Sequence, residues 1–189
     1  MVELATRRAP SPKAAAWLRV LPPATRFSFN GDAAARVAVT PIWEAGFSEE
    51  ACRANVSSTR ATLWLGPDEY LLLDSAVTAT APTRPGTGSA ALFDSLENVL
   101  SGIPHALVDI SHRQFALEVS GPNAATILNG ACPLDLDLGE FPVGMCTRTV
   151  LAKADIVLWR KREDVFHLEV WRSFAGYVSG ILSEIAAGL

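Results

Sequence analysis

Hydrophobic and polar residues follow each other along the chain in a pattern that predicts strand pairs followed by helices. Residues 60–65 alternate with a period of two, and the turn-forming residues Gly66-Pro67-Asp68 join them to the apolar run 69–74. This combination predicts a β-hairpin. Apolar residues then recur at helical spacing from Ser89, and Ser101-Gly102 is typical of a helix end, so a helix is predicted over 89–100.

A second series of elements follows in the C-terminal half. It contains two strands, a short helix, three further strands and a final amphipathic helix, over residues 105–110, 114–119, 120–130, 146–152, 155–160, 165–170 and 173–187. A repeated order of hairpin and helix favours helices that cover antiparallel sheets. The predicted fold class is therefore α+β, with two interlocked units of antiparallel sheet covered by helices.

The N-terminal region has a less regular pattern. Residues 1–26 contain closely spaced prolines on both sides of an alanine-rich stretch, so they are predicted to form an extended arm. Residues 27–189 are predicted to form a single α+β domain, with two interlocked subdomains as the alternative. Within it, residues 36–42 fit a strand, and residues 75–88, rich in proline and glycine, fit a surface loop.

Charge is distributed unevenly between this arm and the rest of the chain. The 189 residues have a formal net charge of −4, yet residues 1–26 carry five basic residues and a single acidic residue. A basic arm on an acidic body does not fit nucleic-acid binding, which requires a basic face on the folded part. It fits an arm that docks on an acidic partner or stays solvated.

Four residues are candidates for contact with a partner. Trp17 lies in the predicted arm beside Arg19, and it fits either an anchor in a partner's pocket or packing against the chain's own core. Arg113 follows a predicted strand and is expected to face solvent or a partner. Arg172 precedes the final helix, where an arginine is compatible with an anion site, although pairing with a nearby acid is favoured.

No catalytic or metal-binding residues are predicted. Asp109, Ser111 and His112 stand close together, but adjacent residues that leave a strand point away from each other, so Ser111 and His112 do not fit a nucleophile and its base. Hydrogen bonds to local backbone at the strand end are favoured instead. The acidic loop 133–140 lacks the ligand pattern of a calcium loop, and neither a dinucleotide nor a phosphate-loop motif is present.

The cysteines and the hydropathy pattern indicate a cytoplasmic protein without a membrane segment. Cys52, Cys132 and Cys146 form no CxxC pair, which favours buried thiols in a reducing compartment over a disulfide framework or a zinc site. No apolar run approaches the roughly 18 residues of a membrane helix. The first 17 residues also lack the apolar region of a secretory signal.

Three segments carry a resemblance to a known family. WLGPDEYLLLD (64–74), VDISHRQFALEVSGPNAATILNGACPLDL (108–136) and the segment 141–185, which contains WRSFAGYV, resemble the gamma subunit of heterotetrameric sarcosine oxidase. More distantly, the chain resembles the folate-binding aminomethyltransferase (T-protein) of the glycine cleavage system. Where that enzyme has a glycine pair and two acids, this sequence has Val150-Leu151 and Ala154-Asp155, so the resemblance implies the fold rather than folate chemistry.

The resemblance implies a non-catalytic structural gamma subunit. The complex would demethylate sarcosine oxidatively to glycine, produce hydrogen peroxide and pass the one-carbon unit to tetrahydrofolate. FAD, FMN, NAD and tetrahydrofolate would be bound by other subunits and none by this chain. The implied partners are the alpha, beta and delta subunits, with alpha in direct contact. A short stand-alone folate-dependent aminomethyltransferase, or a folate-binding module, is the alternative.

Overall fold

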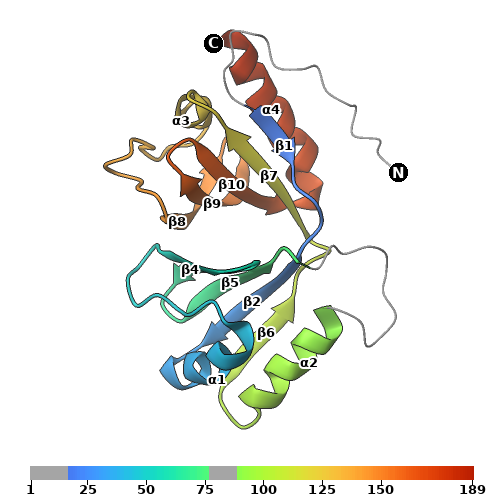
Figure 1. Cartoon of the computed structure of the whole chain (residues 1–189). Helices are drawn as coiled ribbons and strands as arrows, with labels where there is room; N and C mark the ends of the chain where they lie inside the picture. The colour runs from blue at the N-terminus through green and yellow to red at the C-terminus, as the bar shows by residue number, and fades with distance from the viewer. Residues whose placement is uncertain (1–16, 77–88) are drawn as a thin grey trace. The chain divides into compact units, whose positions relative to one another are not determined.

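The computed structural model describes residues 17–76 and 89–189, so the predictions for residues 1–16 and 77–88 lie outside the described residues. The described residues form two five-stranded sheets and four α-helices, and the chain divides into two compact units (Figure 1). Each unit combines segments that are distant in the sequence. The predicted α+β class, with two interlocked antiparallel units, is confirmed.

One unit consists of residues 22–114 and 144–147, apart from those not described. Its sheet has the strand order β3-β4-β5-β2-β6, and each neighbouring pair is antiparallel. The strands and helices of this unit are β2 (Thr25–Gly31), α1 (Ala33–Trp43), β3 (Ala54–Ser57), β4 (Arg60–Gly66), β5 (Glu69–Asp74), α2 (Ser89–Leu100) and β6 (His105–Asp109).

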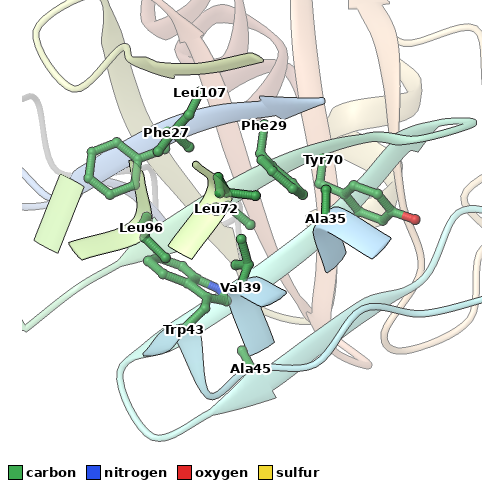
Figure 2. Packing of buried hydrophobic residues seen from close by; sticks show 11 residues of the cluster. Phe27, Phe29, Ala35, Val39, Trp43, Ala45, Tyr70, Leu72, Leu96 and Leu107 are labelled. Carbon is green, nitrogen blue, oxygen red and sulfur yellow. The ribbon is translucent and has the colours of Figure 1, made fainter. Parts of the chain in front are cut away.

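The hydrophobic core of this unit lies between the sheet and its two helices. Figure 2 shows Phe27 of β2 and Leu72 of β5 on the sheet side, with Val39 and Trp43 of α1 and Leu96 of α2 packed against them. The rings of Phe27 and Trp43 meet edge to face, with 6.3 Å between their centroids. Burial of these large apolar side chains supplies the main driving force for the unit.

The predicted strand at residues 36–42 is wrong, because these residues belong to helix α1. Asp32 caps the helix, and its side chain accepts a hydrogen bond from Ala35 N at 3.0 Å. Ala35, Val39 and Trp43 are buried, a spacing of four residues that places them on one helix face. The β-branched residues of this segment favour a strand locally, but the cap and this buried face favour a helix.

The other unit consists of residues 17–21, 115–143 and 148–189. Its sheet has the strand order β1-β7-β10-β9-β8, and α4 contacts the edge strand β1 (Figure 1). The elements are β1 (Trp17–Val20), β7 (Gln114–Ser120), α3 (Ala124–Asn129), β8 (Cys146–Leu151), β9 (Ala154–Arg162), β10 (Val165–Trp171), the 3₁₀ turn η1 (Arg172–Phe174) and α4 (Ala175–Gly188).

The predicted boundary of the N-terminal arm is wrong in the part that the structure describes. Residues 17–20 form β1, which pairs antiparallel with residues 117–120 of β7. Residues 25 and 26 open β2, where they pair with β5. The prolines at 22 and 23 therefore separate two strands of different sheets. Local composition suggested an arm because the partner of β1 is about a hundred residues away in the sequence, and its pairing leaves no local pattern.

The hairpin at 60–74 and the helix at 89–100 are confirmed with nearly their predicted boundaries. The strands predicted between 105 and 170 are also confirmed, as β6 to β10. The last helix begins two residues later than predicted, because residues 172–174 first form a 3₁₀ turn. Across the described residues, no helix combines the length and the apolar character needed to cross a membrane.

Candidate functional site

The end of β6 contains Asp109 and Ser111, which the sequence placed together as a candidate site. Asp109 Oδ1 accepts hydrogen bonds from Ser111 N at 2.8 Å and from Ser111 Oγ at 2.6 Å. Ser111 Oγ also accepts a hydrogen bond from the backbone N of Arg26 in β2, at 2.9 Å. Both polar side chains therefore secure the end of β6 against β2, and the predicted local role is confirmed.

The adjacent residues His112 and Arg113 are exposed in the turn that follows. Arg113 N donates to Ile110 O at 3.0 Å, which closes the turn before β7. The hydroxyl of Ser111 is committed to Asp109 and to Arg26, so it is not poised as a nucleophile for His112 to activate. Arg113 presents an exposed cation at this turn, as the sequence predicts.

The acidic loop is organised by a buried cation that the sequence analysis missed. Arg160 of β9 is almost fully buried, and its guanidinium donates to the carbonyl oxygens of Phe141 at 2.6 Å and Leu136 at 3.2 Å. It also donates to Glu163 O at 2.8 and 3.0 Å and lies over the Phe166 ring. Burial lowers the pKa of Arg160, while nearby Asp137 and Glu163 raise it.

This arrangement has a structural role, because the guanidinium holds backbone carbonyls. Asp135 and Asp137 point into their own loop, where they accept hydrogen bonds from Asp137 N at 2.9 Å and Gly139 N at 2.8 Å. An arginine placed directly after the apolar run 156–159 of β9 was the signal available in the sequence. Among the described residues, no group of three or more histidine, cysteine or acidic side chains has the arrangement of a metal site.

A second buried polar pair lies on β10. His167 Nε2 and Glu169 Oε1 are 2.7 Å apart, and both side chains are buried. The centroid of the His167 ring lies 5.8 Å from that of Trp159, which is the residue of β9 that pairs with His167. Two residues separated by two positions share one face of a strand, so the His-x-Glu spacing was a readable signal that sequence analysis missed. This hydrogen bond gives each of the two buried side chains a polar partner inside the sheet.

The positions compared in the sequence with the glycine and acid pairs of the aminomethyltransferase lie in the β8–β9 hairpin. Leu151 at the end of β8 and Ala154 at the start of β9 are fully buried, whereas Asp155 is exposed. Ala152, in the turn between them, has a positive φ of 52°. The remaining acid therefore faces solvent instead of the packed interior of its unit.

Three of the four predicted contact residues lie in the unit that contains β1 and α4. Trp17 is opposite Ser120 in the β1–β7 pair, and Arg19 forms an ion pair of 2.8 Å with Glu118 of β7. Arg172 is exposed in η1, whereas Arg113 belongs to the unit with β6. Arg19 therefore has an ion-pair partner within its own chain. Arg172 lies in a different element, η1.

Arg172 lies within an exposed aromatic patch that the sequence analysis did not identify. Trp171, Phe174 and Tyr177 are 47%, 39% and 40% exposed, around the junction of β10, η1 and α4. The rings of Phe174 and Tyr177 are 6.5 Å apart in an edge-to-face arrangement. Exposed aromatic side chains next to an arginine have the composition typical of protein–protein contact surfaces.

The arrangement of two antiparallel sheets and four helices is similar to the fold of an aminomethyltransferase. The chain matches aminomethyltransferase T of the glycine cleavage system from Bartonella henselae with a TM-score of 0.64, at 18% identity, over 90% of this chain and 46% of that chain. This likeness concerns the fold alone. The model of the sarcosine oxidase gamma subunit family matches residues 30–188, so the chain belongs to that family.

Individual relatives agree with this assignment. The sarcosine oxidase subunit gamma of Corynebacterium sp. (strain U-96) is 38% identical over 120 residues, 64% of this chain and 52% of the relative. That of Arthrobacter sp. is 36% identical over 115 residues, 61% of this chain and 51% of the relative. The alignments thus span about half the length of these relatives.

A solved structure extends the similarity to nearly the whole chain. A chain of the heterotetrameric sarcosine oxidase from Corynebacterium sp. U-96, in complex with pyrrole 2-carboxylate, matches with a TM-score of 0.81 and 26% identity. The match covers 94% of this chain and 87% of that chain. The resemblance predicted from the three sequence segments is confirmed.

Proposed function

We propose that this chain is a non-catalytic structural subunit of a sarcosine oxidase complex in the cytoplasm. The observation that carries the proposal is the match, over 94% of the chain, to a chain of a heterotetrameric sarcosine oxidase. The polar residues at the end of β6 add support, because Asp109 and Ser111 hydrogen-bond within their own unit. In this proposal, other subunits demethylate sarcosine oxidatively to glycine and form hydrogen peroxide.

We further propose that the aromatic patch of Trp171, Phe174 and Tyr177 contacts the alpha subunit, together with Arg172, which follows Trp171 in the chain. The three rings expose apolar area on the surface, and aromatic side chains often contribute most of the energy of an interface. Arg172 would add a directional contact with an acid or a carbonyl of the partner. The beta and delta subunits complete the proposed complex.

Assembly tests both statements. A tagged form of this chain, co-expressed with alpha, beta and delta subunits, should retain all three on an affinity column. The purified complex should form hydrogen peroxide from sarcosine, whereas this chain alone should form none. The proposal would be contradicted if none of the three subunits were retained, or if the isolated chain oxidised sarcosine.

Substitution in the aromatic patch should weaken assembly without unfolding the chain. Trp171→Ala combined with Tyr177→Ala should raise the dissociation constant for the alpha subunit at least about thirtyfold, because truncating anchor residues costs about 2 kcal/mol or more. Val37→Ala is the matched control, because Val37 is 73% exposed on α1 and lies outside the patch. Surface plasmon resonance measures both dissociation constants. If the double variant and the control bound the alpha subunit equally well, the contact would lie outside the aromatic patch.

We propose that this chain binds no cofactor, and that FAD, FMN, NAD and tetrahydrofolate are bound by the other subunits. The buried Leu151 and Ala154 support this, because they occupy the hairpin positions that the glycine and acid pairs hold in the folate enzyme. Calorimetric titration of the isolated chain with tetrahydrofolate should give no saturable heat at micromolar concentrations, and its absorbance spectrum should lack flavin bands. Micromolar folate binding would favour the folate-binding module.

A further inference from the structure

Two of the three cysteines lie opposite each other across a short antiparallel bridge. Arg53 and Met145 form this bridge, in the unit that contains β3 and β4. On one side of it Ala54 N donates to Gly144 O at 2.8 Å, and on the other side Cys146 N donates to Cys52 O at 2.9 Å. Because the chain segments run antiparallel, the residue before Arg53 and the residue after Met145 are directly opposed. These residues are Cys52 and Cys146.

The usual spacing of opposed residues at an antiparallel bridge is compatible with a disulfide between the two cysteines. Directly opposed residues of a hydrogen-bonded antiparallel pair have Cα atoms about 5.5 Å apart. Disulfides join Cα atoms that are about 4.4–6.8 Å apart. Burial is the main cause that raises the pKa of Cys146, and the Cys52 thiol raises it further. Both cysteines are free thiols in the structure.

The two thiols differ in their surroundings. Cys146 is fully buried, and its Sγ donates to the carbonyl oxygen of Trp64 at 3.5 Å. Burial raises the pKa of Cys146 to about 12, so this thiol stays protonated near neutral pH. Cys52 is partly exposed in the turn before the bridge, with a positive φ of 59°. An oxidant in solution therefore reaches Cys52 first, and Cys146 lies beside it as a resolving thiol.

We propose that Cys52 and Cys146 form a redox-active pair that a peroxide converts into a disulfide. In the first step the Cys52 sulfur attacks one peroxide oxygen, an S–O bond forms, the O–O bond breaks, and one water leaves. The product is a sulfenic acid. In the second step the Cys146 sulfur attacks the Cys52 sulfur, the S–S bond forms and the S–O bond breaks, and the hydroxyl group leaves with the Cys146 proton as a second water. Two thiols lose two electrons, and hydrogen peroxide becomes two waters.

The disulfide would join the turn at Cys52 to the first residue of β8. Only the first two residues of β8, Cys146 and Thr147, are grouped with this unit, and the following residues belong to the other unit. Oxidation would thus link the segment 144–147 covalently to residues 22–114, which belong to the same unit. The closed loop is long, of the order of 90 residues, and long loops constrain the unfolded chain most.

Mild oxidation of the full chain tests the pair, with added hydrogen peroxide as the probe. Of the three thiols, we expect titration to show the loss of two, and peptide mass analysis to find Cys52 and Cys146 cross-linked with the loss of two hydrogens. The melting temperature should rise by about 5 °C or more and return on reduction. Because the peroxide is added, the result does not depend on whether the chain assembles into an oxidase.

Substitutions identify the partners. Cys132→Ser is the matched control, since Cys132 lies in the other unit with its Sγ 3.9 Å from Thr149 Oγ1, and this variant should still form the cross-link. Cys52→Ser should abolish it and leave both remaining thiols titratable. Because Cys52 is partly exposed, the Cys52→Ser variant still tests the proposal if Cys146→Ser fails to fold. Oxidation of Cys52 to a sulfinic acid with Cys146 still reduced, or a cross-link that involves Cys132, would overturn the proposal.

Discussion

Arg160→Ala should lower the free energy of unfolding by about 3–5 kcal/mol. The guanidinium of Arg160 donates to the carbonyl oxygens of Leu136, Phe141 and Glu163 from a buried position. Removing it takes this donor away from the buried carbonyl oxygens of Leu136 and Phe141 and also removes the group that stacks on Phe166. Urea denaturation followed by circular dichroism measures the loss.

Two further variants show whether the loss of stability is specific to the guanidinium group of Arg160. Lys161→Ala removes the next cation along β9, which is exposed, and should change stability by no more than about 0.5 kcal/mol. Arg160→Lys keeps the charge but lacks the planar five-donor fork, so it should recover only part of the loss. If Arg160→Ala and Lys161→Ala were equally stable, the guanidinium would not organise the loop.

Deletion of residues 1–24 should destabilise the chain by about 3 kcal/mol or more, and should promote aggregation. The deletion removes β1, including the ion pair of Arg19 with Glu118 and the hydrogen bond from Leu21 N to Ala116 O. It also turns β7, which contains the buried residues Leu117 and Val119, into a sheet edge. Differential scanning calorimetry and light scattering detect both effects.

The shorter deletion of residues 1–16 is the control. It leaves every described strand in place, because β1 begins at Trp17. We expect its melting temperature to stay within about 2 °C of the full chain, since it removes no described hydrogen bond. Equal stability of the two truncated chains would mean that β1 contributes nothing to its sheet and that the arm extends as far as predicted from the sequence.

Features of this chain that depend on neighbouring residues are predictable from its sequence. The hairpin at 60–74 was predicted because alternation and turn-forming residues lie within 15 positions of each other. The role of Asp109 and Ser111 was predicted for the same reason, since an acid and a hydroxyl at a strand end commonly bond to nearby backbone. The family was recognised from motifs that are likewise contiguous in the sequence.

Predictions from the sequence were wrong where long-range contacts determine the secondary structure. Residues 36–42 have strand-like composition, but their burial against β2, β5 and α2 favours a helix. Local preference is a weak term compared with burial of large apolar side chains, so tertiary packing overrides it.

The α+β class, most strands and helices, and the family can be inferred from the sequence alone, because each is encoded in periodicity or in short contiguous motifs. Only the tertiary structure assigned β1 to its sheet, gave Arg160 its carbonyl partners and placed Cys52 opposite Cys146. The physical reason is that pairing between distant segments depends on the contacts of the whole folded chain. A local pattern shows that a segment can form a strand, but it does not identify the strand's partner.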